Sequence, residues 1–416
     1  MKLELLLLIQ KISLYKQTFN IPNFLIGILE DLKNSSYKPY FVGGCVRDFL
    51  LNKEIKDFDI EVFGLNSLEE LRTILEKHTK VIEVGKTFGV LKIEENGIEC
   101  DFSIPRVEKK VGKTHKSFEV KLFSDLSIKK AAKRRDFTIN AIYYDYFKNS
   151  FIDPFLGLKD LKKRKIRYID KKSFVEDSLR VFRAIGFASR FNFKITKKTK
   201  HLLKDIVKSD ELDNLSRERV FEELKKLFLK SKKPSIGLKL LDELKIFKIS
   251  FFGKYRAINR LSKILENREF EEKRALVLFF TILLRGEKED EVLEFLSKIS
   301  CDKKFLSSIN SLLKESLEDD YISLKKQSLR VVLEDLILIE LAFKNKNLSS
   351  IIKKCEEFDI LNRALKPHIM GVDLLELGFS PSCDFRNMLN FALDLQIREN
   401  ISKEEIKSSI LKNFVK

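Results

Sequence analysis

The sequence predicts an α+β protein, in which a small mixed sheet near the N-terminus is followed by helices as far as the C-terminus. Short runs of apolar residues flank Gly43-Gly44 and Asn96-Gly97, and this pattern is typical of strands joined by tight turns. From about residue 167 the apolar residues recur at helical spacing instead. We therefore expect one sheet-containing domain followed by an all-helical remainder.

The composition indicates the class of protein and of partner. A chain of 416 residues can hold about two to four domains, and its net charge of +18 favours a polyanionic partner such as nucleic acid. Its five cysteines form no C-x-x-C pair, so neither a zinc site nor a disulfide framework is indicated. The apolar run at residues 5–9 is too short to span a bilayer. We expect a cytoplasmic protein without a membrane partner.

The stretch at residues 37–51 predicts a strand, a Gly43-Gly44 turn and a short helix. Glycines let backbone N–H groups approach a triphosphate closely, and the N-terminus of a helix favours anions. Arg47, in the first turn of this helix, can add a charge-assisted hydrogen bond. A Gly-Gly turn alone is common, and it indicates a phosphate site only in combination with other residues.

Asp57 and Asp59 follow on the next predicted strand. Side chains two residues apart project from the same face of a strand, so both carboxylates face one way while Phe58 and Ile60 face the core. Paired carboxylate oxygens suit Mg²⁺, which usually takes one or two protein carboxylates plus substrate phosphates. Carboxylate pair and glycine turn together, in this order and spacing, favour metal-dependent nucleotidyl transfer over an ordinary acidic strand end.

A third carboxylate is expected nearby. Asn96-Gly97 predicts a hairpin of residues 89–94 and 98–103, which places Asp101 on a strand that can neighbour the pair. Asp101 is the candidate base for an attacking hydroxyl, although a solvated strand end fits the pattern equally well. Glu61 shares the face of the pair and competes for this role.

The next segments supply further polar candidates. Ser67 is predicted to cap a helix over residues 67–77, and the Lys-rich stretch at residues 105–133, which contains His115, is predicted to be a mobile loop. The stretch RRDFTINAIYYD starts with Arg134 and Arg135, whose fork-shaped guanidinium donors suit phosphates. Asp136 and Asn140 in the same stretch can hold a ribose or orient the arginines.

A capping box is predicted at residues 173–176, where Ser173 and Glu176 would begin a helix that runs through residue 191. Asp177, Arg180 and Arg183 recur every three residues on the polar side of that helix. Taken by itself, this spacing is better explained by an ordinary surface ion pair than by a binding site.

Seven stretches in order, at residues 37–227, resemble the class II tRNA nucleotidyltransferase (CCA-adding) and bacterial poly(A) polymerase family. They are FVGGCVRDFLL, KDFDIEVFG, CDFSIPR, RRDFTINAIYYD, DPFLGLKDL, EDSLRVFRAIGFASRFNF and SRERVFEELKKLF. The later stretch PHIMGVDLLELGFSP is similar to the tail of CCA-adding enzymes, more loosely.

The resemblance implies a nucleotidyltransferase head of the polymerase β type and a helical neck, body and tail. We expect a helical cap (residues 1–34), the catalytic head (35–166), a neck with base-recognition and RNA-binding helices (167–233), and a tRNA-binding body and tail (234–416). The HD-type phosphohydrolase domain of some relatives is not expected, because none of the four histidines is followed by aspartate.

The resemblance also implies a role for each matched residue. The metal-ligating residues would be Asp57 and Asp59. Nucleotide-binding residues would be Gly43, Gly44 and Arg47 at the triphosphate, Arg134, Asp136 and Asn140 at sugar and phosphates, and Asp177, Arg180 and Arg183 near the base. Cytosine and adenine both present an amino donor beside a ring-nitrogen acceptor, so one Asp–Arg pair can select both and reject uracil and guanine.

The implied activity is template-independent addition of C, C and A to the 3′ end of tRNA, with Mg²⁺ as cofactor and tRNA, ATP and CTP as partners. No obligate protein partner is evident. The alternatives within the family are A-only addition, CC-only addition and poly(A) tailing. Those outside it are a non-catalytic RNA-binding protein and a transferase acting on proteins or small molecules.

Overall fold

The computed structural model describes residues 19–84, 89–110, 118–122, 126–266, 268–345, 348–381, 384–399 and 401–414. The chain divides into two compact units. The first runs to Leu224 and takes in Leu244–Ile246, while the second holds Lys225–Glu243 and Phe247–Lys416.

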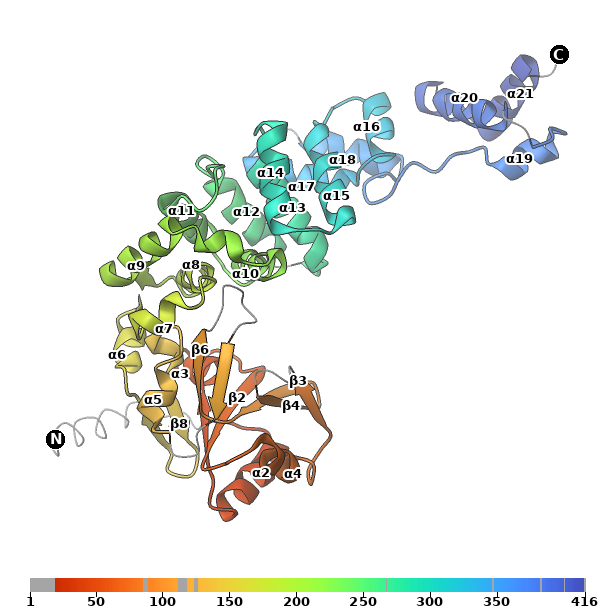
Figure 1. Ribbon diagram of the computed structural model, residues 1–416. Coiled ribbons are helices and arrows are strands. Elements are labelled where there is room, and N and C mark those ends of the chain that lie inside the picture. Colours follow the sequence, from red (N-terminus) through yellow and green to blue (C-terminus); the bar gives the residue numbers. More distant parts are fainter. Residues whose placement is uncertain are drawn as a thin grey trace. The chain divides into compact units, whose positions relative to one another are not determined.

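A seven-stranded sheet organises the first unit (Figure 1). Its strands are β1 (Lys38–Val42), β2 (Asp57–Phe63), β3 (Val81–Val84), β4 (Val90–Glu95), β5 (Ile98–Ser103), β8 (Tyr143–Asp145) and β9 (Ser150–Ile152). They lie in the order β3-β4-β5-β2-β1-β8-β9. β2 and β5 are parallel and the other neighbours antiparallel, so the sheet is mixed, as the sequence predicted.

Two small sheets and a set of short helices complete the first unit. The small sheets are the antiparallel pair β6 (Arg106–Lys110) and β7 (Phe118–Leu122) and the parallel pair β10 (Lys165–Ile166) and β11 (Lys194–Ile195). The helices are α2 (Asn23–Asn34), α3 (Gly44–Leu50), α4 (Leu68–Leu75), α5 (Ile128–Ala132), η2 (Thr138–Asn140), α6 (Gly157–Lys162), α7 (Lys171–Val175), α8 (Arg180–Phe191), α9 (Lys197–Lys208), η3 (Glu211–Asn214) and the first turns of α10 (Arg217–Leu229). Helices α2 and α4 lie side by side (Figure 1).

Local sequence signals explain the elements around the site. The Ser67 hydroxyl accepts a hydrogen bond from the backbone N–H of Glu70 and so caps α4, which confirms the prediction. Asn96 (φ 52°) and Gly97 (φ 76°) both have positive φ, as the two-residue turn of a hairpin requires. Phe58 and Ile60 are buried, so β2 alternates as predicted.

Two sequence-based expectations are wrong. Part of the Lys-rich stretch forms β6, β7 and α5 rather than a loop, because residues 106–110 and 118–122 pair as antiparallel strands. His115 lies outside the described residues. The helix predicted from Ser173 is broken into α7 and α8. The side chain of Asp170 caps α7 by accepting from the N–H of Ser173, and the chain turns at residues 176–179.

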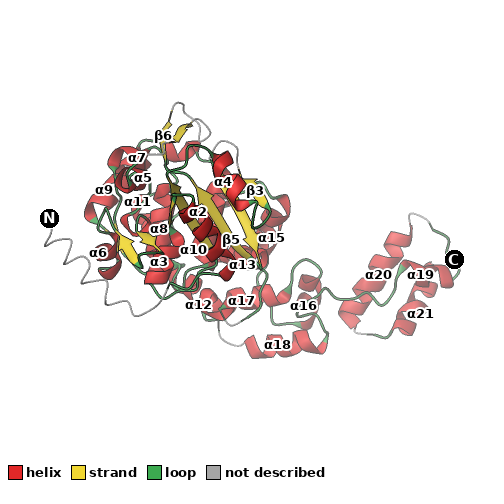
Figure 2. Ribbon diagram, turned by 90° about the horizontal axis from the view of Figure 1, so that it is seen from below, coloured by secondary structure: helices red, strands yellow, loops and turns green. Residues whose placement is uncertain are grey.

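The second unit contains only helices among its described residues (Figure 2). They are the end of α10, α11 (Ser235–Leu244), α12 (Tyr255–Leu265), α13 (Glu272–Leu284), α14 (Glu289–Ile299), α15 (Lys303–Lys314), α16 (Tyr321–Ser328), α17 (Leu333–Phe343), α18 (Leu348–Glu357), α19 (Gly371–Glu376), α20 (Asp384–Glu399) and α21 (Lys403–Phe414). Helix α13 is buried on every side from Ala275 to Leu284 and is therefore central to the core. None of the described helices combines the length and apolar character that crossing a membrane requires.

Candidate active site

The Gly43-Gly44 turn joins β1 to α3 beside the aspartate strand. Gly43 has φ +82°, a backbone conformation that favours glycine, and the N–H of Gly44 donates to Oδ2 of Asp59 at 3.3 Å. A Cβ added at Gly43 would lie 2.6 Å from the same oxygen. The turn therefore packs directly against a predicted metal ligand, and only glycine fits.

The parallel pairing of β2 with β5 brings the three aspartates together on two neighbouring central strands of the sheet. Asp59 is the register partner of Asp101, and Asp57 is the partner of Glu99, so the hairpin prediction for Asp101 is confirmed in position. Lys92 on β4 lies 3.9 Å from Oδ1 of Asp101 and 2.7 Å from Glu99. Lys92 is thus shared between Asp101 and Glu99.

The chemistry of this donor set fits a divalent cation. Oδ1 of Asp101 is buried and has no hydrogen-bond partner among the described residues. Burial raises the pKa of Asp101, Lys92 lowers it, and the negative charges of Asp59, Glu99 and Asp57 raise it further. A bound cation would relieve this repulsion, because hard carboxylate oxygens are the ligands Mg²⁺ prefers. Within the described ranges, no three acidic, His or Cys side chains are already gathered tightly enough to form a metal cage.

Glu61 does not share this environment. Its side chain has 0% exposure, and its carboxylate accepts hydrogen bonds from Nη2 of Arg134 (2.9 Å) and from the hydroxyl of Tyr143 (2.5 Å). Burial by itself would raise the pKa of Glu61, but the guanidinium groups of Arg134 and Arg135 hold it below its ordinary value. With Glu61 committed to these partners, Asp101 is the stronger candidate for the third carboxylate.

Arg47 lies inside the unit rather than on its surface. Its Nη1 donates to Oδ1 of Asn140 (2.7 Å), and its Nε and Nη2 donate to Asp48 (2.9 and 2.8 Å). Its guanidinium also lies 4.9 Å from the ring centroid of Phe191, and Arg190 reaches Asp48 at 3.4 Å. Arg47 therefore ties α3 to η2 and α8, and its predicted contact with a triphosphate stays a prediction.

Asp136 continues the same buried network. Its Oδ1 accepts from Nδ2 of Asn140 (2.9 Å), and its Oδ2 accepts from Nε (2.8 Å) and Nη2 (2.7 Å) of Arg183. Burial would raise the pKa of Asp136, but Arg183 and Asn140 outweigh it and lower the pKa. Asp136, Asn140 and Arg183 thus connect η2 to α8.

Replacing Asp136 with asparagine should lower the free energy of unfolding by ~3 kcal/mol at neutral pH, because Arg183 loses its buried counter-charge. A carboxylate with a depressed native pKa contributes stability above its unfolded pKa of about 3.9, and this contribution is lost as the pH falls toward the native value. The difference between variant and wild type should therefore be constant from pH 7 to about 5 and shrink below about pH 4. Urea denaturation across this range measures it; a constant difference at all pH values would contradict the ion-pair explanation.

The predicted base-reading residues lie at the break between α7 and α8. Oδ1 and Oδ2 of Asp177 each lie 3.2 Å from Nη2 of Arg219, which comes from α10. Arg180 instead donates to the carbonyl oxygens of Ser173 and Arg134, each at 2.7 Å. Asp177 and Arg180 are thus held by separate partners.

The predicted set of nucleotide-binding residues does not contain three residues that the structure places at the site: Arg135, Tyr143 and Arg219. Nη1 of Arg135 would lie 3.2 Å from a Cβ at Gly43, so this side chain reaches the glycine turn. The Arg134-Arg135 pair already indicated phosphate-binding donors, but no local pattern says which arginine faces the turn. Tyr143 and Arg219 come from β8 and α10, so only the tertiary structure brings them here.

Comparison with known families identifies the sheet-containing domain. Residues 39–167 match the model described as "Poly A polymerase head domain". The first unit contains a poly A polymerase head. Residues 192–252 match a second model, described as "Probable RNA and SrmB-binding site of polymerase A". The predicted family resemblance is confirmed.

Relatives of the poly A polymerase head carry related names. The chain is 36% identical over 209 residues to the "Multifunctional CCA protein" of Stenotrophomonas maltophilia, covering 50% of this chain and 49% of the relative. It is 37% identical over 239 residues to the "CCA-adding enzyme" of Buchnera aphidicola, covering 57% and 55%. The matches therefore span about half the length of these curated relatives.

Solved structures share the fold over more of the chain. The Bacillus stearothermophilus CCA-adding enzyme in complex with CTP superposes with a TM-score of 0.72 at 23% identity, covering 94% of this chain and 98% of that one. The Thermotoga maritima CCA-adding enzyme complexed with tRNA superposes with a TM-score of 0.66 at 23% identity, covering 97% and 98%. The predicted fold class, a head with a mixed sheet followed by helices, is confirmed.

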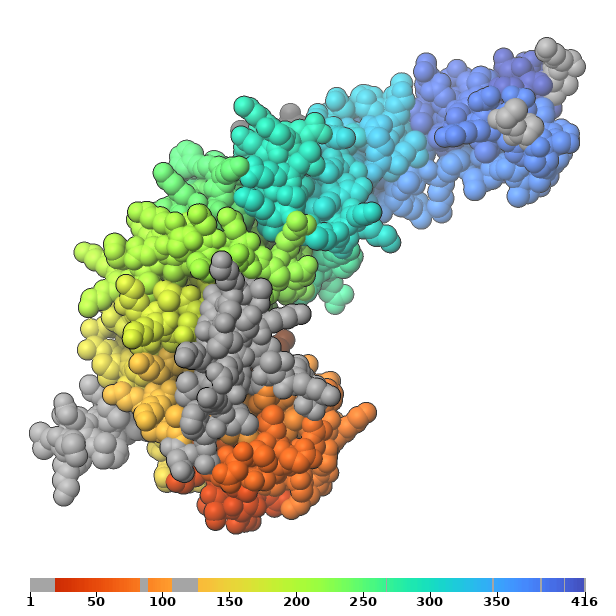
Figure 3. Space-filling model, viewed as in Figure 1, coloured from red at the N-terminus to blue at the C-terminus, as the bar shows by residue number. Residues whose placement is uncertain are grey.

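A basic hollow lies between α7 and α9, within the same unit as the poly A polymerase head. It measures about 440 Å³, and Lys171, Lys197, Lys198 and His201 contribute to its lining. Helix α9 is part of the outer surface (Figure 3). Lys197 and Lys198 are exposed and form no ion pair with any described residue. These lysines are therefore candidates for contacts with RNA phosphates.

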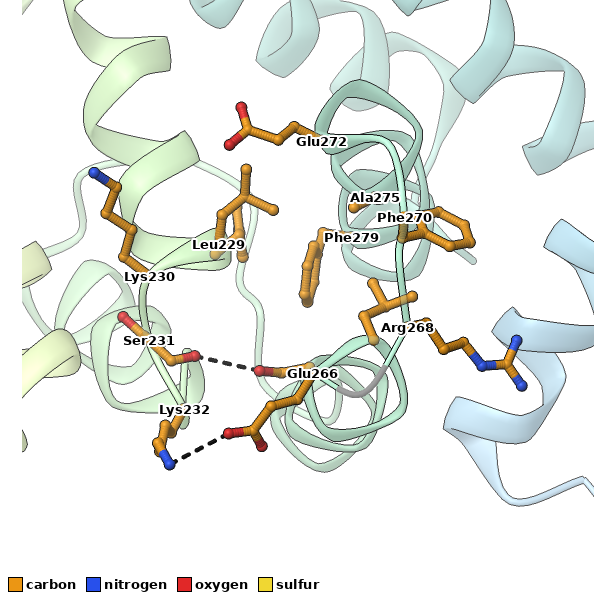
Figure 4. A pocket seen from close by; sticks show the side chains of 13 residues that line it. Leu229, Lys230, Ser231, Lys232, Glu266, Arg268, Phe270, Glu272, Ala275 and Phe279 are labelled. Atoms are coloured by element: carbon orange, nitrogen blue, oxygen red, sulfur yellow. Dashed lines mark hydrogen bonds and ion pairs between the residues drawn. The ribbon is translucent and has the colours of Figure 1, made fainter. Parts of the chain in front are cut away.

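A second cavity, of about 300 Å³, lies in the helical unit and has different chemistry (Figure 4). Phe279 and Leu229 line it, and Lys232 is paired with Glu266 at 3.2 Å. The side chains of Lys230 and Arg268 point away from the cavity (Figure 4). Its cations do not converge, so we assign it no anion site.

Proposed function

We propose that this protein is a template-independent RNA nucleotidyltransferase that adds C, C and A to the 3′ end of tRNA from CTP and ATP and releases pyrophosphate. The proposal is supported by the names and complexes of the relatives and by the poly A polymerase head. A-only addition, CC-only addition and poly(A) tailing are the nearest alternatives, because all would use the same head.

One observation carries the chemical part of the proposal. The Gly43-Gly44 turn contacts Asp59, and Asp59 is the register partner of Asp101, so a triphosphate-binding turn and a carboxylate cluster share one site. A binding protein without catalytic function has no use for repelling carboxylates beside a glycine turn. Transfer of a nucleotidyl group requires a group that binds the triphosphate and carboxylates that bind metal ions within the same site.

The residues would divide the work as follows. Asp57 and Asp59 would hold divalent cations, Mg²⁺ by preference, which when bound supply Lewis-acid activation and neutralise developing charge. The N–H groups of the turn and the arginines at residues 134–135 would grip the triphosphate. Asp101 would accept the proton of the RNA 3′-hydroxyl as that oxygen attacks the α-phosphate in line and pyrophosphate leaves.

Base selection would fall to Asp177 and Arg180. The amino group of cytosine or adenine would donate to Asp177, and the neighbouring ring nitrogen would accept from Arg180. Both side chains would exchange a protein partner for the base, since Arg219 and the carbonyl of Ser173 now hold them. Uracil and guanine present the reversed pattern and would leave both groups unpaired.

The test is incubation of the full chain with Mg²⁺, labelled CTP or ATP, and three RNAs: tRNA lacking CCA, tRNA lacking only the final A, and oligo(A). Addition of C, C, A to the first and of A to the second, then arrest, would support CCA addition. Incorporation of A on the second RNA alone would indicate A-only addition, C, C alone on the first would indicate CC-only addition, and long tails on all three would indicate poly(A) tailing. No incorporation anywhere would overturn the enzyme assignment.

A further inference from the structure

Glu61 is a buried acid that neither the metal site nor the base site uses. It projects from the same face of β2 as Asp57 and Asp59, yet its side chain has 0% exposure. A buried carboxylate is strongly unfavourable unless it is paired and hydrogen-bonded. Its pairing therefore indicates what it does.

Three groups from one short segment surround this carboxylate. Arg134 donates to Oε1 at 2.9 Å and Tyr143 donates to Oε2 at 2.5 Å. The guanidinium group of Arg135 lies 5.8 Å from the ring centroid of Tyr143, the same residue whose hydroxyl donates to Glu61. Glu61 therefore holds Arg134 directly and is joined to Arg135 through Tyr143.

Arg135 borders the glycine turn through its side chain, and Arg134 contacts a base-site residue through its backbone. Nη1 of Arg135 would lie 3.2 Å from a Cβ at Gly43, so it borders the turn. Its Nε is buried without a hydrogen-bond partner among the described residues. The carbonyl oxygen of Arg134 accepts from Nη2 of Arg180 at 2.7 Å. An anchor on this segment therefore affects both the triphosphate end and the base end.

We propose that Glu61 is a positioning residue, whose buried carboxylate fixes the guanidinium group of Arg134 directly and that of Arg135 through Tyr143, so that Arg135 beside the Gly43-Gly44 turn receives the triphosphate. This inference rests on the proposed function. Two adjacent arginines repel each other and have many rotamers, so an unanchored pair would have to be ordered when the nucleotide binds. Glu61 orders the arginine side chains before the nucleotide binds, because its carboxylate offsets their positive charge and holds their guanidinium groups in one orientation.

The decisive comparison is between Glu61→Ala and Glu61→Gln in the full chain. Binding of inorganic tripolyphosphate, measured by calorimetry with Mg²⁺ present, reports the triphosphate grip without base or sugar. Removing a negative charge should by electrostatics alone tighten anion binding. Loss of the anchor should instead weaken it ~10–100-fold in Glu61→Ala, the range expected for charge-assisted hydrogen bonds. Glu61→Gln keeps an acceptor for Arg134 and should restore part of the affinity.

Steady-state kinetics supply a second readout. The KM for CTP and ATP should rise in Glu61→Ala, whereas the KM for tRNA should stay near wild type, because the candidate lysines for RNA phosphates lie on α9 and do not depend on Glu61. Glu340→Ala is the matched control: Glu340 is also buried and lies 2.6 Å from Nη1 of Arg285, but in the helical unit. It should lower the Tm without changing tripolyphosphate binding.

Tyr143→Phe keeps the carboxylate of Glu61 and removes only the phenol hydroxyl. It therefore tests the positioning role of Glu61 if Glu61→Ala does not fold. It should weaken tripolyphosphate binding ~3–10-fold, as one lost hydrogen bond predicts. The inference would be overturned if Glu61→Ala bound tripolyphosphate as tightly as wild type or more tightly. If Glu61→Ala does not fold, the same result in Tyr143→Phe would overturn it. It would also be overturned if the wild-type protein bound no tripolyphosphate. If tripolyphosphate binding depends on Glu61 but no RNA is extended, the anchor stands and the transferase assignment falls.

Discussion

Replacement of Asp59 by alanine is expected to lower nucleotide incorporation by at least ~10³-fold, since loss of a catalytic metal ligand removes several kcal/mol of transition-state stabilisation. Asp59 carries this expectation because it contacts the glycine turn and pairs in register with Asp101. RNA binding should change little, because phosphate contacts made by lysines dominate affinity. Single-turnover incorporation and filter binding of tRNA measure the two effects separately.

The control for this variant is Glu94→Ala. Glu94 is an exposed acid on β4 of the neighbouring hairpin, and its loss changes the net charge by the same amount. It should incorporate nucleotides at the wild-type rate. Incorporation by Asp59→Ala within about tenfold of wild type, with the control unaffected, would sink the metal-ligand assignment.

Gly43→Ala is expected to have the second-largest effect, a loss of ~10²-fold in incorporation, because displacement of a reacting group by about 1 Å is that damaging. The new Cβ would lie 2.6 Å from Oδ2 of Asp59, so the carboxylate or the turn must move. The positive φ of +82° adds strain of ~1–3 kcal/mol. Kinetics and a urea unfolding curve on the same preparation separate displacement from destabilisation.

Gly97→Ala separates these two causes. Gly97 has φ +76° in the β4–β5 turn, so alanine there suffers a comparable backbone strain. No described atom lies within 4 Å of its would-be Cβ, so nothing is displaced. It should lose ~1–2 kcal/mol of stability and keep its activity. Equal loss of activity in both glycine variants would show that strain, rather than contact with Asp59, is responsible.

Local signals were sufficient for the parts of the site that lie on one turn or one hairpin. The Gly43-Gly44 turn, the alternation of β2 and the Asn96-Gly97 hairpin each follow from a few adjacent residues, and the structure has all three. Strand period then determines which side chains share a face. The position of Asp101 could be predicted for this reason, whereas the choice between it and Glu61 could not.

That choice depends on partners that are distant in sequence. Glu61 and Asp59 are equivalent by strand period, but Tyr143 and Arg134 come from segments more than 70 residues away and bury one of them. The break before α8 was missed for a different reason. Ser173 and Glu176 fit a capping box, but Asp170, three residues before Ser173, is the N-cap of a short helix that ends at Val175. When two residues in one short stretch could each cap a helix, the sequence alone does not show which of them does so, because the choice depends on tertiary packing.

One polar network also bears on which residues fold together. Its members are Arg47, Asp48, Asp136, Asn140, Arg183 and Arg190. It leaves α8 through Arg190, passes through α3 and η2, and returns to α8 through Arg183, so it closes on itself. A fragment confined to the matched head, residues 39–167, would lack α8, so Asp136 would lose its ion pair with Arg183 and Asp48 would lose its contact with Arg190. The polar network of the head is therefore complete only with α8, and we expect a fragment that includes α8 to be more stable than one that ends at residue 167.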